Sequence, residues 1–210
     1  MKYKVMIVED QTMPRELFEL RIQASEHFEA ALSIDNAALA DVYCLRFPVD
    51  LILMDVVTRG GESGLDAAER IKRTFPQIKI IIVTSMPECS YLSRAREIGV
   101  ESFWYKEEQR ESLLDMMERT MAGESVYPDA TPELQLGLAS SYKFTDRELE
   151  VLREMTGGDT NQEIAERLHM SVATVKTHIL NMLEKTGFKN RTELAVRARE
   201  SGLVILNRKN

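Results

Sequence analysis

The sequence predicts an α/β domain followed by an all-α domain, and three features of the 210-residue chain lead to this expectation. Short apolar runs alternate with amphipathic segments through residues 1–123, the pattern of a doubly wound parallel sheet of (βα)5 type. Residues 124–142 hold two prolines and little hydrophobic periodicity, which favours a linker. In residues 143–210 the apolar positions recur at helical spacing, which predicts a compact unit of four helices.

The expected strands of the first domain are apolar runs followed by polar segments, at residues 4–8, 28–33, 51–54, 79–83 and 103–105. Helical patterns separate and follow them, at residues 14–23, 36–44, 65–74, 91–98 and 109–121. Strands that alternate with helices of this length form right-handed βαβ units, so we expect a parallel sheet. Pro14 suits a first helical turn, and Gly99 and Gly123 suit helix ends.

The expected helices of the last domain are residues 146–155, 161–168, 172–185 and 191–200. Their starts carry capping residues: Thr145 with Glu148, Thr160 with Glu163, Ser171, and Asn190 with Glu193. Short helices joined by turns of a few residues are typical of a helix-turn-helix module. A further helical turn is expected inside the linker, at residues 134–138.

Composition excludes several classes of protein. Hydrophobic residues make up 44% and charged residues 29% of the chain, as in ordinary globular proteins. The longest apolar runs are far shorter than the ~20 residues that cross a bilayer, so no membrane segment is expected. The start of the chain runs straight into a strand pattern, so we expect no signal peptide. Cys44 and Cys89 form no metal or redox motif, and we expect reduced thiols in a cytoplasmic protein.

Charge is unevenly distributed along the chain. Residues 1–123 carry a net charge of −6, residues 124–142 carry −3, and residues 143–210 carry +2. A polyanion would be repelled by the first two segments, so only the last third is suited to approach one.

Charged and hydroxyl side chains follow the ends of the expected strands. These residues are Glu9, Asp10, Asp55, Thr84 and Lys106. The carboxyl edge of a parallel sheet is where ligands bind, so we expect these side chains to converge there. Three neighbouring carboxylates repel one another unless a hard cation such as Mg²⁺ neutralises them. With Lys106 and Thr84 added, the group is suited to hold a phosphoryl group on Asp55.

Residues 1–123 resemble the CheY-like receiver domain of two-component response regulators, since all five of these positions are filled. The resemblance implies that Asp55 accepts a phosphoryl group from a histidine kinase. It further implies that Mg²⁺ is held by Glu9, Asp10, Asp55 and the backbone carbonyl of Val57. By the same resemblance, Thr84 and Lys106 contact the phosphoryl oxygens, and Phe103 is the aromatic switch residue.

The loop after Asp55 departs from the receiver pattern. Receivers usually place Met-Pro three and four residues after the phosphoacceptor, where this chain has Thr58 and Arg59. The glycine expected eight residues on is found nine residues on, as Gly64. We therefore expect a loop that is one residue longer and lacks a rigid proline, which puts the rate of phosphorylation in question.

A phosphohydrolase of the haloacid dehalogenase type is a rival interpretation, because such enzymes also use Asp, Thr, Lys and Mg²⁺. They require a second aspartate two residues after the nucleophile, as a general acid and base. This chain has Val57 there, and an apolar side chain cannot transfer protons. We therefore expect no enzyme activity apart from phosphorylation and dephosphorylation at Asp55.

Residues 143–200 resemble the LuxR/NarL-type helix-turn-helix domain, through the segments 144–152, 161–168, 171–178 and 189–195. One stripe of the third helix is apolar and is expected to face the core, at Val172, Val175, Ile179 and Leu183. The opposite face is suited to enter a DNA major groove. The expected DNA-binding residues are Thr174, Lys176, Thr177, His178, Asn181, Lys185, Lys189 and Arg191, of which Lys185, Lys189 and Arg191 lie where phosphates would pass.

Together the two resemblances identify a two-component response regulator that binds double-stranded DNA. Phosphorylation of Asp55 is expected to change the face built from residues 91–121, which then favours a homodimer or releases the output domain and so increases DNA binding. Two alternatives remain at this point. In one, the altered loop makes the receiver unresponsive, and the domain serves only for dimerisation. In the other, which Val57 disfavours, the protein is a phosphatase of the haloacid dehalogenase type.

Overall fold

The computed structural model describes residues 2–88, 90–106 and 112–204. The chain forms two compact units, one built mainly from residues before 130 and the other mainly from residues 130 onward. Cys89 and the first three residues of the helix expected at 109–121 lie outside the described residues. Each unit is described separately below.

The first unit is an α/β fold. Its strands are β1 (Tyr3–Val8), β2 (Phe28–Ile34), β3 (Leu51–Met54), β4 (Lys79–Thr84) and β5 (Ser102–Tyr105). Its helices are α1 (Thr12–Gln23), the 3-10 helix η1 (Ala37–Leu39), α2 (Ala40–Arg46), α3 (Gly64–Thr74), α4 (Ser90–Ile98) and α5 (Leu113–Met121). Strands and helices alternate as the sequence predicts, although the helix expected at 36–44 begins with a 3-10 turn and ends two residues later.

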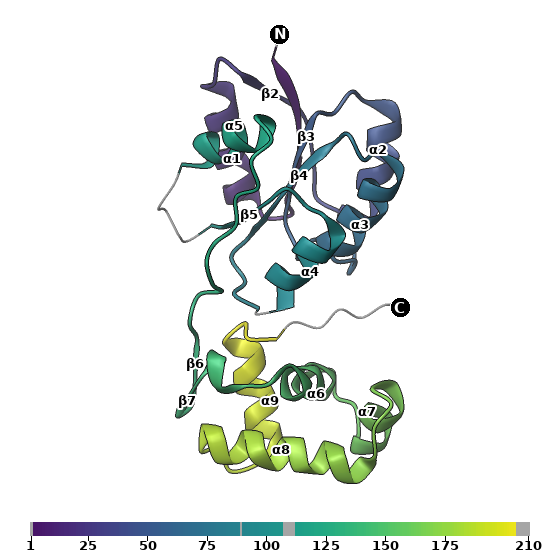
Figure 1. The fold of residues 1–210 in the computed structure, drawn as a ribbon, viewed down its shortest axis with the longest axis vertical. Coiled ribbons are helices and arrows are strands. Elements are labelled where there is room, and N and C mark those ends of the chain that lie inside the picture. Colours follow the sequence, from purple (N-terminus) through teal and green to yellow (C-terminus); the bar gives the residue numbers. More distant parts are fainter. Residues whose placement is uncertain (1, 89, 107–111, 205–210) are drawn as a thin grey trace. The chain divides into compact units, whose positions relative to one another are not determined.

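Within the described residues the strands form one parallel sheet in the order β2-β1-β3-β4-β5. Helices α1 and α5 cover one face and α2, α3 and α4 cover the other (Figure 1). Every residue of β3 is buried, because both faces of this central strand are covered. The prediction of a doubly wound (βα)5 sheet is confirmed.

The register of the sheet determines which side chains meet at its carboxyl edge. Val8 at the end of β1 pairs with Met54 at the end of β3, so Glu9 and Asp55 follow at neighbouring positions. Thr84 at the end of β4 pairs with Tyr105 at the end of β5, one residue before Lys106. The polar residues after these strands are therefore brought to one edge, as expected.

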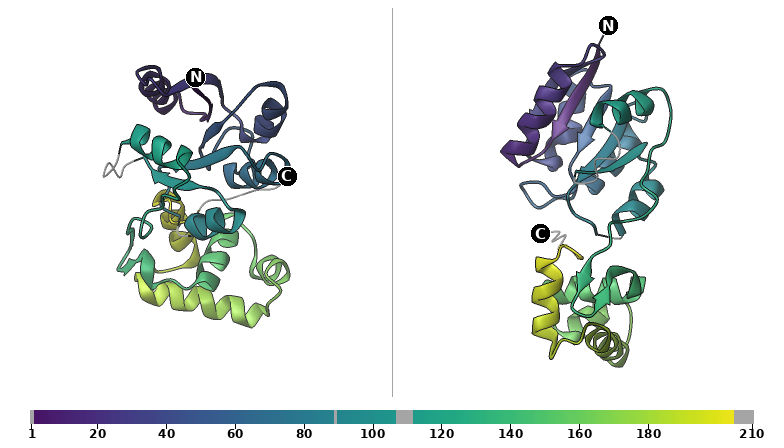
Figure 2. Two further views of the ribbon diagram at one scale, coloured as in Figure 1. Left: turned by 45° about the horizontal axis from the view of Figure 1, so that its top comes forward. Right: turned by 90° about the vertical axis from the view of Figure 1, so that its left-hand side faces the viewer.

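The second unit is mainly helical. It contains the short strands β6 (Gln135–Leu136) and β7 (Ala139–Ser140), the 3-10 helix η2 (Ser141–Lys143), α6 (Asp146–Thr156), α7 (Asn161–Arg167), α8 (Val172–Thr186) and α9 (Arg191–Glu200). Helix α8 packs against α6, α7 and α9 (Figure 2). Val175, Ile179 and Met182 supply its buried stripe, in one apolar cluster with Leu149 and Ile164.

The helix starts in this unit follow the predicted capping chemistry. Complete capping boxes join Thr145 to Glu148 and Thr160 to Glu163. The side chain of Ser171 accepts a hydrogen bond from the backbone of Thr174 at the start of α8. These bonds satisfy backbone donors that a helix end would otherwise leave free, so they fix where each helix begins.

The helical turn expected at residues 134–138 is wrong. This segment forms an antiparallel hairpin in which Leu136 pairs with Ala139. Gly137 has a φ of 62°, the left-handed region that a tight turn requires, and a Cβ there would lie 2.2 Å from the Thr186 carbonyl oxygen. Leu136 and Ala139 are buried in the core of the helical unit, so the hairpin belongs to that core.

Among the described residues, no helix is both long enough and apolar enough to span a membrane.

Candidate functional site

Asp55 lies at the centre of the carboxyl edge and is only 4% exposed. Its backbone N–H donates to the Val8 carbonyl, which continues the pairing of β3 with β1. Its side-chain Oδ1 accepts a hydrogen bond from the backbone N–H of Val56 at 2.7 Å. The carboxylate is therefore held in a fixed orientation by the chain that immediately follows it.

Lys106 brings a positive charge to this carboxylate. Its ammonium lies 2.9 Å from Oδ2 of Asp55 and also forms an ion pair with the buried carboxylate of Glu9. Glu9 is fully buried, and its Oε1 accepts a hydrogen bond from the backbone of Gln11. A single cation therefore bridges two buried carboxylates contributed by neighbouring strands.

Burial raises the pKa of Asp55 from 3.8 to about 6. Loss of hydration is the largest cause, since it disfavours the charged form of a carboxyl group. The positive charge of Lys106 opposes this shift, and the negative charge of Glu9 adds to it. The group is thus poised to respond to a further positive charge in the pocket.

Asp10 completes a cluster of carboxylates suited to a metal ion. Oxygen atoms of Glu9, Asp10 and Asp55 all lie within 4.8 Å of one another. An all-oxygen, strongly negative donor set of this kind fits a hard divalent cation such as Mg²⁺ and does not suit a softer metal that prefers sulfur or imidazole. The residues present therefore fit the metal that the receiver resemblance implies.

The remaining receiver positions lie around this pocket. Thr84 is fully buried at the end of β4, and its carbonyl accepts a hydrogen bond from the Lys106 backbone at 3.0 Å. Val57 is 37% exposed, directly after the Asp55–Val56 turn. Phe103 is fully buried on β5, three residues before Lys106. The proposed roles of these residues remain predictions, although their positions suit them.

Gly64 shows how the longer loop after Asp55 rejoins the fold. A Cβ at this position would lie 1.9 Å from the backbone oxygen of Asp55. The N–H of Gly64 also donates to the carbonyl of Val56 at 2.8 Å. Only glycine permits this close approach to the Asp55 backbone. The additional residue of the loop is therefore accommodated between Asp55 and Gly64.

The first residues of the linker pack on β5. The Phe103 backbone donates to the carbonyl of Val126 at 2.9 Å, which fixes the start of the linker against the edge strand β5. The ring of Tyr127 lies 6.3 Å from the ring of Phe103, and the Arg96 guanidinium lies 4.4 Å from the Tyr127 ring centroid. The Tyr127 hydroxyl donates to the carbonyl of Val100. From the sequence alone, Tyr127 is expected only to be part of the linker.

The predicted DNA-binding face of α8 faces solvent. Thr174, Lys176, Thr177 and Asn181 are exposed, and His178 is half-buried. The Thr177 hydroxyl donates to the Ala173 carbonyl one turn earlier, and the Thr174 hydroxyl is bonded to Ser171. Lys176 and Asn181 are further exposed polar side chains on this face.

Two cations predicted to contact phosphate are engaged within the helical unit instead. The Lys185 ammonium binds both carboxylate oxygens of Glu148, which is 2% exposed, and also the Lys143 carbonyl. The Arg191 guanidinium donates to the side chain of Asn161 and the carbonyl of Asp159. Lys189 is exposed. Of the three, Lys189 is the residue most accessible to a phosphate.

Comparison with known families assigns both units. Residues 5–118 match the response regulator receiver domain, and residues 142–198 match the luxR family of bacterial regulatory proteins. The chain belongs to the response regulators. It is a phosphorylation-dependent, DNA-binding transcription regulator, and neither the phosphohydrolase nor the unresponsive-receiver alternative is favoured.

Known relatives share the whole architecture of this response regulator. It is 31% identical to the response regulator protein VraR of Staphylococcus epidermidis, over 97% of this chain and 100% of that protein. The VraR protein of Staphylococcus aureus is also 31% identical, with the same coverage.

Solved structures share its fold. Two RcsB dimers bound to two parallel DNAs match with a TM-score of 0.62 at 18% identity, covering 95% of this chain and 98% of that one. RcsB of Salmonella enterica serovar Typhimurium, bound to a promoter in the presence of BeF3−, matches at 0.62 and 20% identity, covering 97% and 100%. The response regulator ChrA matches at 0.53 and 20% identity, covering 96% and 98%.

Proposed function

We propose that Asp55 is the phosphoacceptor of this response regulator and that a histidine kinase is the phosphoryl donor. The observation that supports this most directly is the buried Asp55 carboxylate, fixed by Val56 and paired with Lys106. In the transfer, an Asp55 oxygen forms a bond to phosphorus while the bond from phosphorus to the donor imidazole breaks. The imidazole then takes up a proton, so charge and atoms balance.

Mg²⁺ would be held in this pocket by the carboxylates of Glu9, Asp10 and Asp55 and by the Val57 carbonyl. The metal would supply positive charge to the transferring phosphoryl group, whose equatorial oxygens carry the negative charge. Lys106, already 2.9 Å from Asp55, neutralises a further oxygen. The Thr84 hydroxyl at the end of β4 donates a hydrogen bond to the bound phosphoryl group.

The signal would then pass from Thr84 and Phe103 to the linker. Phosphorylation adds about −1.5 to −2 charges to the pocket, and Thr84 moves toward them. Phe103 moves with Thr84 and alters its contact with Tyr127, where the linker is bonded to β5. The face formed by α4, β5 and α5 thereby changes, which favours a homodimer.

The output would be binding of double-stranded DNA by α8. Lys176, Thr177 and Asn181 are expected to read base edges, with Thr174 and His178 beside them. Lys189 is expected to contact a phosphate, whereas Lys185 and Arg191 would reach one only after giving up internal partners. The related RcsB structures contain DNA, dimers and BeF3−, which supports the same assembly for this chain.

Phosphorylation with a small phosphodonor tests this function. The wild-type chain, incubated with acetyl phosphate and Mg²⁺, is expected to gain the mass of one phosphoryl group and to lose it in base. Asp55→Asn is expected to gain none. Trp104, the one tryptophan of the sequence, offers a second readout through its fluorescence on addition of BeF3−. A modification that is stable in base, or equal labelling of Asp55→Asn, would refute the assignment.

A further inference from the structure

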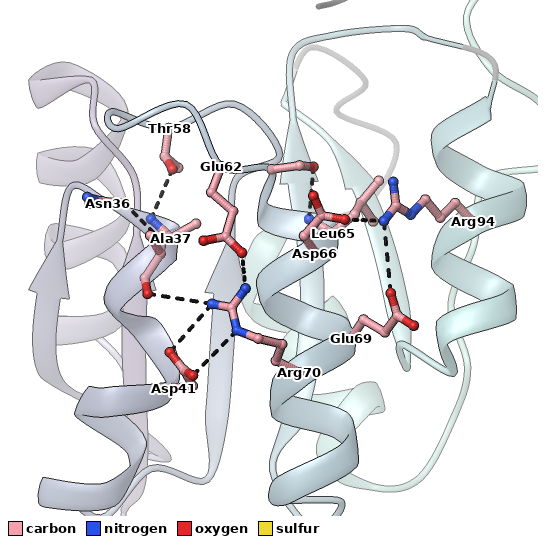
Figure 3. Close-up of polar contacts among 12 residues, drawn as sticks. Asn36, Ala37, Asp41, Thr58, Glu62, Leu65, Asp66, Glu69, Arg70 and Arg94 are labelled. Carbon is pink, nitrogen blue, oxygen red and sulfur yellow. Dashed lines mark hydrogen bonds and ion pairs between the residues drawn. The ribbon is translucent and has the colours of Figure 1, made fainter. Parts of the chain in front are cut away.

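The loop between β3 and α3 is anchored at Thr58, although it lacks the proline usual in receivers. Thr58 is 7% exposed, and its hydroxyl oxygen accepts a hydrogen bond from the buried backbone N–H of Ala37 at 3.0 Å. Ala37 begins η1, on the connection between β2 and α2 (Figure 3). The side chain that replaces the usual methionine therefore joins this loop to the neighbouring one.

Backbone and ionic contacts of Arg59 reinforce this junction. The Arg59 N–H donates to the Asp35 carbonyl at 3.2 Å, and its guanidinium lies 3.3 Å from the Asp35 carboxylate. The Arg59 side chain is 72% exposed, so the ion pair contributes little by itself. The backbone bond next to Thr58 is the stronger constraint.

Arg70 anchors the far end of the loop. From α3 its guanidinium binds Glu62, the next-to-last residue of the loop, and lies 3.4 Å from Asp41 on α2 (Figure 3). It also donates to the Ala38 carbonyl at 3.5 Å. One planar cation thus joins the loop, η1 and α2, a task suited to the several donors of arginine.

The inserted length is taken up between these anchors. Gly60 and Gly61 have φ values of 95° and 80°, which let the chain turn sharply there. A Cβ on Gly60 would lie 2.7 Å from the Asn36 side chain, so the turn packs closely on the neighbouring connection. This turn lies beyond Thr58, so Val56 and Val57, which directly follow Asp55, are not part of it.

We infer that Thr58 and Arg70 are positioning residues for Mg²⁺ binding and phosphorylation at Asp55. The inference rests on the proposed function, since Thr58 directly follows Val57, whose carbonyl is the proposed metal ligand. A loop held in place before the metal arrives loses less conformational entropy on binding. Residues that orient metal ligands without touching the metal typically change its affinity by about 10- to 100-fold when replaced.

Replacement of the Thr58 hydroxyl tests the first anchor. Thr58→Val keeps the shape of the side chain but removes the acceptor, whereas Thr58→Ser keeps the acceptor. By calorimetric titration of the full-length chain with Mg²⁺, Thr58→Val is expected to bind about tenfold more weakly than wild type. Thr58→Ser is expected to bind as wild type does. Amide hydrogen exchange at residues 56–63 is expected to be faster in Thr58→Val alone.

Arg70→Gln tests the second anchor, with Arg73→Gln as its matched control. Arg73 lies on the same helix and pairs with Glu69, outside the loop, so both variants lose one positive charge. Arg70→Gln is expected to weaken Mg²⁺ binding and Arg73→Gln to leave it unchanged. Should Thr58→Val fail to fold, this pair decides the question.

Wild-type affinity for Mg²⁺ in a folded Thr58→Val protein would overturn the inference, as would equal affinities of Arg70→Gln and Arg73→Gln. Failure of the proposed function looks different. In that case the wild-type chain itself would neither bind Mg²⁺ nor accept a phosphoryl group from acetyl phosphate.

Discussion

At the scale of single residues, burial makes ionisation of the Asp55 carboxyl group unfavourable. Its pKa is raised from 3.8 to about 6, so the folded protein holds this proton more tightly than the unfolded chain. Below about pH 4 both states are protonated and the group has no effect on stability. As the pH rises from about 4 to about 6, the unfolded chain ionises while the folded protein still holds the proton, so stability is lost, and the loss is complete above about pH 6.

Replacement of this carboxyl group should therefore stabilise the fold. In metal-free buffer near neutral pH, Asp55→Asn is expected to raise the free energy of unfolding by on the order of 2 kcal/mol. Lys106 keeps Glu9 as its partner in this variant. Near pH 4 the two proteins should be equally stable. Urea unfolding at both pH values measures this, and a variant less stable than wild type at neutral pH would show that the Lys106 pair dominates.

The same pKa predicts how phosphorylation depends on pH. In the proposed reaction the nucleophile is the ionised carboxylate of Asp55, so the rate with acetyl phosphate at low Mg²⁺ should fall as the pH drops through about 6. Bound Mg²⁺ favours the carboxylate, so saturating metal should move the fall to lower pH. A rate that is constant from neutral pH to about pH 5, at low metal, would be inconsistent with the raised pKa.

Lys185 and Lys189 are both predicted from the sequence to contact phosphate, but they have different surroundings in the structure. Lys185→Ala would leave Glu148 buried without its cation, and we expect a loss of about 2 kcal/mol in unfolding free energy. Lys189 is exposed, so Lys189→Ala should leave stability unchanged. It should instead weaken binding to all DNA sequences alike and reduce the salt slope by about one unit.

Thermal melts and DNA titrations over a range of salt concentrations separate the two roles. Equal stability of both variants would mean that the Lys185–Glu148 pair contributes little. Lys176→Ala supplies the contrast on the base-reading face, because it should change sequence preference. If Lys176→Ala left both affinity and preference intact, the proposed docking of α8 would be wrong.

At the scale of elements, the linker is part of the receiver as far as Tyr127. The Tyr127 ring packs near both Phe103 and Arg96, and Val126 is bonded to the β5 backbone. Burial raises the pKa of the Tyr127 hydroxyl to about 12, so it stays protonated and keeps its bond to Val100. A change at Phe103 therefore reaches the linker through direct contact.

Tyr127→Ala is expected to uncouple input from output. Phosphorylation of Asp55 should proceed as in wild type, because Tyr127 lies outside the pocket. Phosphorylation should increase the DNA affinity of this variant about tenfold less than that of wild type. A factor of about ten corresponds to a typical coupling free energy between two sites. The control is Tyr142→Ala, since the Tyr142 hydroxyl bonds to Thr131 and the side chain is exposed. If Tyr127→Ala kept the full response, the linker contact would not carry the signal.

Those features of the fold and of the site that depend on local sequence patterns could be predicted from the sequence. Strand ends, capping boxes and the alternation of elements predicted the sheet, the helix starts and the convergence on Asp55. The hairpin at Leu136 was missed because a glycine turn between apolar residues fits a helical turn equally well. The internal partners of Lys185 and the anchor at Thr58 depend on residues far away in sequence, so no local pattern reveals them.

At the scale of the whole molecule, the charges suit a regulated DNA-binding protein. Residues 1–123 carry −6 and residues 143–210 carry +2, so the receiver by itself repels DNA. A dimer lets two helical domains contact half-sites about one helical turn, ~10 bp, apart. The proposed dimerisation would therefore offset the weak net charge of each helical domain by linking two binding events.

The central claim is that phosphorylation of Asp55 controls DNA binding. Genomic fragments bound by the phosphorylated chain would be selected first. The affinity of the wild-type chain and of Asp55→Asn for one such fragment would then be measured at fixed salt, with and without BeF3− and Mg²⁺. We predict that BeF3− shifts the wild-type chain to a dimer and increases its affinity at least about tenfold, and that Asp55→Asn does not respond. Equal affinity of the wild-type chain in both conditions would contradict the account.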